Sequence, residues 1–138
     1  MAAGAIYPDV ILAWWKACPP QEQEQRAQAL WESVSDELSP LLGALGVATL
    51  LGRCQCMCRG AFPWLEAADG SCPMTADWRQ LMGRMDGRAP HDTLAANRML
   101  FIALHELMQV LIGASLTAGV LEAAWIECKR RLASGPWL

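Results

Sequence analysis

The chain has 138 residues and a net charge of −3, with 54% apolar and 18% charged residues. This composition excludes a disordered chain, and the length predicts a single domain over residues 1–138 with a core of its own. Basic residues are not in excess, and the one basic cluster, 129–131, falls where it offsets the dipole of the last predicted helix. Nucleic acid is therefore not an expected partner.

Proline and glycine divide the first half of the chain into predicted helices. The first covers 8–18 and is stopped by Pro19, and the second starts at Pro20, where proline suits a first helical turn. It continues to Leu38, with a kink or break near Pro40. Residues 43–46 are rich in glycine and predict a turn, and a third helix is expected over 47–59.

A long loop, 60–74, leads into the second half. Thr75 is the predicted N-cap of a fourth helix, whose apolar stripe has helical spacing at Trp78, Leu81, Met82 and Met85. A long fifth helix runs from Pro90 and ends or bends at Gly113. The sixth carries one apolar side at Leu116, Val120, Ala124 and Cys128. The sequence predicts an all-α, single-domain bundle of five or six helices, with no internal repeat.

Two stretches without charge, 38–52 and 107–121, are the longest apolar runs. They are shorter than the roughly 20 residues that span a bilayer, so we expect no membrane partner. The N-terminus carries no charged residue before its apolar run, so no export signal is expected. Six cysteines without such a signal predict reduced thiols and a cytoplasmic protein.

Three alternating cysteines, Cys54, Cys56 and Cys58, resemble a metal site. On a helix, however, Cys54 and Cys58 share a face while Cys56 points to the other side. The three thiolates then cannot converge on one tetrahedral ion, and Cys72 in the adjacent loop is the only further ligand nearby. We expect no metal, and we leave open whether any of these cysteines has a redox role.

Seven tryptophans are spread over the chain, and two of them are adjacent in the first helix. Together with Ile11, Trp14 and Trp15 make this helix apolar on nearly every side. Burial on two sides would cover it, one side against the bundle and the other against a second subunit. The sequence thus predicts a homodimer with Ile11, Trp14 and Trp15 at its interface. Residues 62–65, Phe-Pro-Trp-Leu, form either a plug at the end of the bundle or an exposed recognition element.

The fifth helix carries one of the two histidines at the border of its apolar face. On a helical wheel, Arg98, Gln109 and Glu106 form most of the polar stripe, and His105 falls at its edge. Asn97 is the one polar residue within the apolar arc beyond the first turn. We therefore interpret His105, Glu106, Arg98 and Gln109 as a candidate site that accepts phosphate or contacts a ligand. A structural histidine bonded to a neighbour is the alternative.

The triplet His105-Glu106-Leu107, followed by Leu111, resembles the phosphoacceptor box of histidine-kinase dimerisation helices. The resemblance implies that His105 accepts phosphate and that Glu106 assists proton transfer. The sequence departs from that box at Met108, where arginine is usual. It also departs from the pattern of histidine phosphotransfer domains at Met108 and Gln109.

A second resemblance covers roughly the C-terminal half. Residues 62–65, Leu107, 111–113 and 116–117 are similar to a family of short, uncharacterised proteobacterial helical proteins associated with sensor-kinase systems. This resemblance implies a signalling context, with a sensor kinase or response regulator as partner.

The sequence contains no convergent catalytic set, no glycine-rich phosphate loop and no second histidine in register with His105. We therefore expect a non-enzymatic helical module for signalling or protein interaction, acting as a homodimer without a cofactor. One alternative is a phosphate carrier that uses His105. Another is a sensor that binds an apolar ligand or haem inside the bundle, with His105 as axial ligand.

Overall fold

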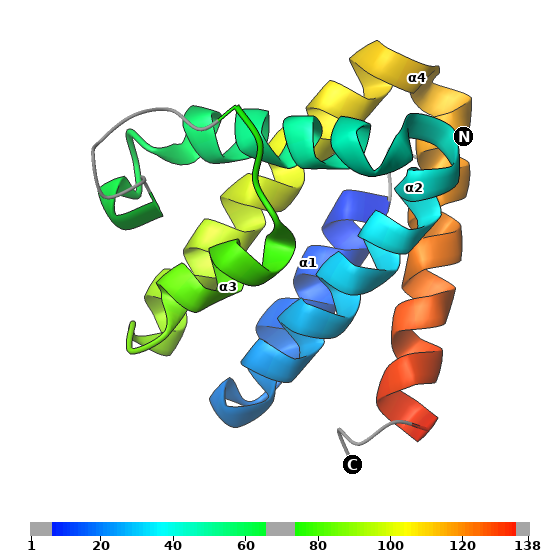
Figure 1. Ribbon diagram of the computed structural model, residues 1–138. Helices are drawn as coiled ribbons and strands as arrows, with labels where there is room; N and C mark the ends of the chain where they lie inside the picture. The colour runs from blue at the N-terminus through cyan, green and yellow to red at the C-terminus, as the bar shows by residue number, and fades with distance from the viewer. Residues whose placement is uncertain (1–6, 66–73, 135–138) are drawn as a thin grey trace.

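All regular structure in the described residues, 7–65 and 74–134, is helical (Figure 1). This computed structural model contains α1 (Tyr7–Ala17), α2 (Pro20–Cys58), the 3-10 turn η2 (Pro63–Leu65), α3 (Trp78–Met85) and α4 (Pro90–Ser134). Packing of α2 on α4 forms most of the interior, while α1 packs mainly on α4 and α3 packs on α2. The predicted all-α class is confirmed.

The two long helices each bend at a glycine. Gly43 in α2 has φ 76° and ψ 164°, and Gly113 in α4 has φ 83° and ψ 165°. This region of backbone space is open essentially only to glycine. We divide α2 into a first arm, 20–42, and a second arm, 44–58, and α4 into 90–112 and 114–134. Within the described residues four helices are observed instead of the predicted five or six, because α2 and α4 each join two of the predicted helices across a kink at a glycine whose backbone is not helical.

The start of α3 differs from the prediction by two residues. Asp77, not Thr75, is the N-cap, and its carboxylate accepts a hydrogen bond of 2.9 Å from the backbone N–H of Arg79. Thr75 lies outside the helix because the next residue, Ala76, donates its N–H to the carbonyl of Ala48 at 2.9 Å. This bond ties the segment before α3 to α2. The stripe of α3 is buried as predicted, at Trp78, Leu81, Met82 and Met85.

The two long helices are equivalent to each other under a shift of 70 residues. This shift superimposes Pro20, where α2 begins, on Pro90, where α4 begins, and it superimposes the bend at Gly43 on the bend at Gly113. Buried positions coincide as well: Leu30 with Leu100, Val34 with Leu104, Leu38 with Met108, Leu50 with Val120, Leu51 with Leu121, and Cys58 with Cys128. The chain thus repeats one unit, a short helix followed by a long bent one. The prediction of no repeat was wrong.

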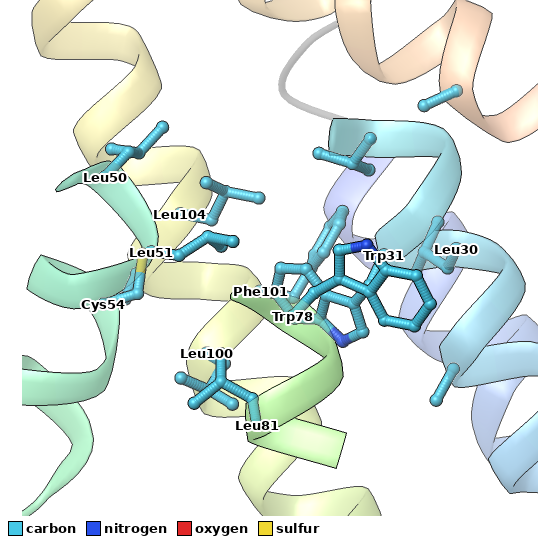
Figure 2. Close-up of a cluster of buried hydrophobic side chains, with 14 of the residues drawn as sticks. Leu30, Trp31, Leu50, Leu51, Cys54, Trp78, Leu81, Leu100, Phe101 and Leu104 are labelled. Carbon is cyan, nitrogen blue, oxygen red and sulfur yellow. The ribbon is translucent and has the colours of Figure 1, made fainter. Parts of the chain in front are cut away.

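A pseudo-two-fold axis passes between Trp31 and Phe101. These two residues are equivalent under the 70-residue shift, and their rings are 6.2 Å apart in an edge-to-face arrangement. A residue can touch its own equivalent only close to the symmetry axis. Figure 2 shows Leu51 and Cys54, from the second arm of α2, beside Leu104 on the first arm of α4. Each repeat therefore reaches across the axis to cover the other.

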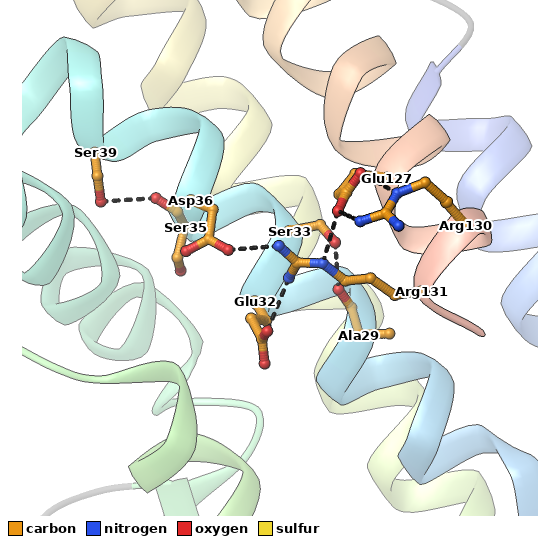
Figure 3. A network of polar contacts seen from close by, with 9 residues as sticks. All are labelled: Ala29, Glu32, Ser33, Ser35, Asp36, Ser39, Glu127, Arg130 and Arg131. Atoms are coloured by element: carbon orange, nitrogen blue, oxygen red, sulfur yellow. Dashed lines mark hydrogen bonds and ion pairs between the residues drawn. The ribbon is translucent and has the colours of Figure 1, made fainter. Parts of the chain in front are cut away.

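The reciprocal contact, between the second arm of α4 and the first arm of α2, is closed by ion pairs (Figure 3). The guanidinium of Arg131 lies 2.9 Å from Glu32, 2.7 Å from Asp36 and 3.1 Å from Glu127. Hydrogen bonds from Arg130 and Arg131 lower the pKa of Glu127 to about 2. One of the basic residues at the end of α4, Arg131, thus joins the two repeats, although this cluster was predicted only to offset a helix dipole.

The repeat differs at one buried position, where Thr117 in α4 replaces Val47 in α2. The Thr117 hydroxyl is fully buried and has no hydrogen-bond partner among the described residues. The residue four positions earlier is Gly113, whose backbone is not helical. Thr49, by contrast, donates to the carbonyl of Leu45 at 2.8 Å.

We expect Thr117→Val to raise the free energy of unfolding by about 1 kcal/mol, because it removes an unpaired hydroxyl without changing the side-chain shape. Urea denaturation followed by tryptophan fluorescence measures the change. The reverse substitution at the equivalent position, Val47→Thr, should be destabilising. A loss of stability in Thr117→Val would show that the hydroxyl is satisfied.

Candidate functional site

The predicted site residues are all on the first arm of α4, where they differ in exposure. His105 is half-buried and interacts with other groups in the chain, whereas Glu106, Gln109 and Arg98 are exposed. Arg98 lies seven residues before His105, which is almost two full turns and about 10 Å along the helix axis. Arg98 lines a groove that faces α1. The four residues share one stripe of the helix, as predicted.

The apolar face of this arm is buried in its middle and exposed near the bend. Phe101, Leu104 and Met108 are fully buried. The predicted polar residue in this face, Asn97, is also buried, and its Oδ1 accepts a hydrogen bond of 3.0 Å from Trp31 Nε1. Toward the bend, however, Val110 is 84% exposed. The helical wheel did not predict this exposure, because it cannot show where a neighbouring helix ends.

The predicted interface residues of α1 are covered by the chain itself. Ile11 and Trp15 are fully buried, so neither has surface left for a second copy. Trp14 is half-buried and packs edge-to-face on Trp125 at 4.8 Å, with the Arg26 guanidinium 4.7 Å from its ring centre. The side of α1 that carries Trp14 is thus covered by Trp125 and Arg26 of the same chain, not by a second subunit.

The cysteine run follows the predicted geometry of a helix. Cys54 and Cys58 are both buried, and both are free thiols. Burial raises the pKa of Cys54 to about 12 and that of Cys58 to about 11, so both stay protonated at neutral pH. Protonated thiols are poor nucleophiles and poor metal ligands.

Cys56 differs from its neighbours in exposure and in oxidation state. It is half-exposed and disulfide-bonded, which departs from the expected reduced thiols. Cys72, considered as a further ligand, lies outside the described residues. Within 7–65 and 74–134, no three histidine, cysteine, aspartate or glutamate side chains lie together in a way that would hold a metal ion.

Residues 62–65 close one end of the core. Leu65 is fully buried, and its carbonyl accepts a hydrogen bond from the buried side chain of Gln55. Phe62 and Trp64 pack edge-to-face at 5.8 Å, and Arg88 covers the Trp64 ring at 4.7 Å. Of the two predicted roles for this segment, burial favours the plug.

An exposed apolar surface lies at the two bends, which occupy the same end of the molecule (Figure 1). We call it the elbow surface, and its members are Leu41, Leu45, Val110, Leu111 and Leu116. Leu45 is 73% exposed and Val110 is 84% exposed. Large apolar side chains that stay exposed at one end of a molecule are typical of an interaction site.

The elbow surface is suited to complete burial because it carries no charge. No charged residue occurs in 38–52 or in 107–121, the stretches that contain the two bends. The hydroxyl of Ser39 donates to the carbonyl of Ser35 at 2.9 Å, and Thr49 bonds its own helix in the same way. Covering these two hydroxyls would therefore leave neither without a hydrogen bond.

Comparison with known proteins does not add to this description. No protein-family model, curated protein or solved structure matches the chain. The two resemblances drawn from short motifs therefore stay predictions.

Proposed function

We propose that the chain is a non-enzymatic interaction module that acts as a homodimer, with the elbow surface as its interface. The observation that carries this proposal is the uncharged apolar surface at the two bends. Side chains as exposed as Leu45 and Val110 lose contact with water on association, and each contributes about 1.5–3 kcal/mol when fully covered.

A second copy of the chain fits this surface better than a charged partner does. An uncharged apolar surface is complementary to itself, and a two-fold dimer brings the same surface of both subunits together. The internal repeat supports the same arrangement, because both repeats contribute their bend to the surface. Each subunit of the dimer would then contribute two equivalent bends to the interface.

A lipid bilayer is the main competing occupant. By length and composition alone, α2 and α4 are long and apolar enough to cross a membrane. The first charged residues that flank the bends are Glu37 and Arg53 in α2, and Glu106 and Glu122 in α4. Three of these four are acidic, whereas surfaces that dock on membranes carry basic residues around the apolar face. This charge distribution favours the second copy.

We expect the double variant Leu45→Glu/Val110→Glu to be monomeric under conditions where the unaltered chain is a dimer. Burying two carboxylates at an apolar interface should weaken association by more than about 100-fold. Sedimentation equilibrium from one to 100 μM (about the range of modest interfaces) measures both constants. Since both positions are exposed, the melting temperature of the monomer should change little.

Ile126→Glu is the matched control. Ile126 is 57% exposed on the second arm of α4, about 20 Å along the helix from Gly113. This variant should dimerise like the unaltered chain. A monomeric unaltered chain at 100 μM would refute the proposal, as would equal weakening by Ile126→Glu. Flotation of the chain with phosphatidylcholine vesicles, lost in the double variant, would assign the surface to lipid instead.

A further inference from the structure

A groove runs along the molecule between α1 and the first arm of α4. Its volume is about 770 Å³, within the range of roughly 300–1,000 Å³ that is usual for small-molecule sites. Its apolar wall comes from both helices and from the loop after α2: Leu12, Phe62, Leu94, Met99 and Ile102. None of these residues belongs to the elbow surface.

The charges along the groove are mostly positive. Lys16 and Arg98 both line it, and neither has an ion-pair partner among the described residues. His91 also lines it, beside Asp92 at 3.2 Å. Asp9 is the one acid in the wall.

These charges are not spread evenly along the groove. The helices α1 and α4 run antiparallel here (Figure 1), so Lys16 at the end of α1 lies near His91 at the start of α4. Asp9 lies toward the other end, near Ile102. The groove therefore has a cationic end, an apolar middle with Arg98 at its rim, and a weakly acidic far end.

We propose that this groove binds a single-chain anionic amphiphile, such as a long-chain carboxylate. The acyl chain lies along Leu94, Met99 and Ile102, where it covers apolar side chains that are otherwise exposed or half-exposed. The carboxylate lies at the cationic end, within reach of Lys16, with Arg98 contributing from the rim. An anion there gives Lys16 the partner that the chain itself does not supply, and it is also attracted by the unpaired charge of Arg98.

The size of the groove favours an acyl chain over a docked helix. A helix 10–12 Å in diameter fills roughly 420–610 Å³ per 5.4 Å turn, so the groove has room for fewer than about two turns. Helices that bind in grooves use anchors over at least two turns, at i, i+3, i+4 and i+7. A flexible chain one methylene wide makes no such demand.

The test is a fluorescence titration of the full-length chain with dansyl-labelled undecanoate, kept below its critical micelle concentration. We expect saturable binding that laurate displaces and that dodecan-1-ol, the neutral analogue, displaces about tenfold less well. Lys16→Gln/Arg98→Gln should weaken laurate binding by about tenfold, since two exposed ion pairs are lost. Ala95→Trp, which places a large ring in the groove, should abolish binding.

Arg53→Gln is the matched control, because it removes an exposed cation outside the groove. It should bind laurate like the unaltered chain. Circular dichroism should show that every variant melts within a few degrees of the unaltered chain, since the altered residues are exposed. Leu45→Glu/Val110→Glu should bind laurate normally, which separates this proposal from the dimer.

Several results would overturn the proposal. They are the absence of saturable binding, equal displacement by laurate and dodecan-1-ol, and loss of binding in Arg53→Gln. Binding to anionic vesicles without binding to the monomeric amphiphile would identify a bilayer surface instead. Displacement of the probe by an acidic amphipathic peptide but not by laurate would assign the groove to a protein partner.

Discussion

Phe101→Ala is expected to lower the free energy of unfolding by about 3–5 kcal/mol. Phe101 is fully buried at the pseudo-two-fold axis, where its ring packs edge-to-face on Trp31 with 6.2 Å between the ring centres. Truncation there removes contacts from both repeats at once. It also leaves a cavity that neither can fill without moving against the other. Urea denaturation with a fixed m-value measures the change.

The control is the other phenylalanine of the chain, Phe62. Phe62 is half-buried in the plug at the end of the core, and it does not belong to the pair of residues, Trp31 and Phe101, that marks the pseudo-two-fold axis. Phe62→Ala should cost clearly less than Phe101→Ala, because a half-exposed ring loses less buried area and leaves no closed cavity. Equal losses for the two variants would contradict the assignment of Phe101 to the centre of the fold.

Gly113→Ala is expected to lower the free energy of unfolding by about 1–3 kcal/mol. A Cβ at Gly113 would meet no atom within 4 Å, so the loss does not come from a clash. It comes from the backbone, because φ 83° and ψ 165° are strained for every residue with a side chain. Gly43→Ala should have the same effect, since Gly43 is its equivalent in the first repeat.

Gly119→Ala in the same helix provides the matched control. A Cβ at Gly119 also meets nothing within 4 Å, but its φ is not positive. Alanine there should raise the free energy of unfolding by roughly 0.5–1 kcal/mol, the usual gain over glycine in a helix interior. If Gly113→Ala and Gly119→Ala shift stability in the same direction, the bend at Gly113 is not a requirement of the backbone.

The sequence was sufficient to predict most of the helical segments and the direction changes at the two glycines, but the kink expected near Pro40 is found at Gly43, three residues later. The apolar spacing of α3 was correct, and the residues at 43–46 and at Gly113 were correctly singled out. These features depend on local physics: helical periodicity, proline at a helix start, and glycine where φ is positive. Whether a glycine produces a turn or a bend depends on tertiary packing, which local patterns do not contain.

The repeat was not predicted because its two copies have diverged in residue type. Only eight of the 39 positions of α2 carry the same residue in α4 under the 70-residue shift, among them the two prolines and the two bend glycines. Burial is preserved through substitutions such as Trp31 for Phe101 and Leu38 for Met108. Cores accept such exchanges when volume and apolar character are kept, so the shape of the repeat outlasts its sequence.

The candidate sites show the same limit. Composition correctly showed that α1 is apolar on nearly every side, but it could not show that the cover comes from the same chain, as at Trp14 and Trp125. The sequence likewise did not predict that Val110 and Leu45 are exposed. Val110 falls within the predicted apolar arc of its helix and Leu45 within the predicted turn, and neither pattern shows whether another helix covers the residue. The elbow surface therefore became visible only in three dimensions.

Chemical cross-linking at the bends tests the central claim, a homodimer through the elbow surface, most directly. Ser115 is exposed beside Gly113, and Gln80 is exposed on α3, so Ser115→Cys and Gln80→Cys offer matched thiols inside and outside the surface. The free thiols Cys18, Cys54, Cys58 and Cys128 are buried with raised pKa values, so they should react little with a short bis-maleimide. We predict a cross-linked product of twice the 15.1 kDa chain mass for Ser115→Cys and none for Gln80→Cys. A single-chain product for both variants, or equal cross-linking of both, would contradict the account.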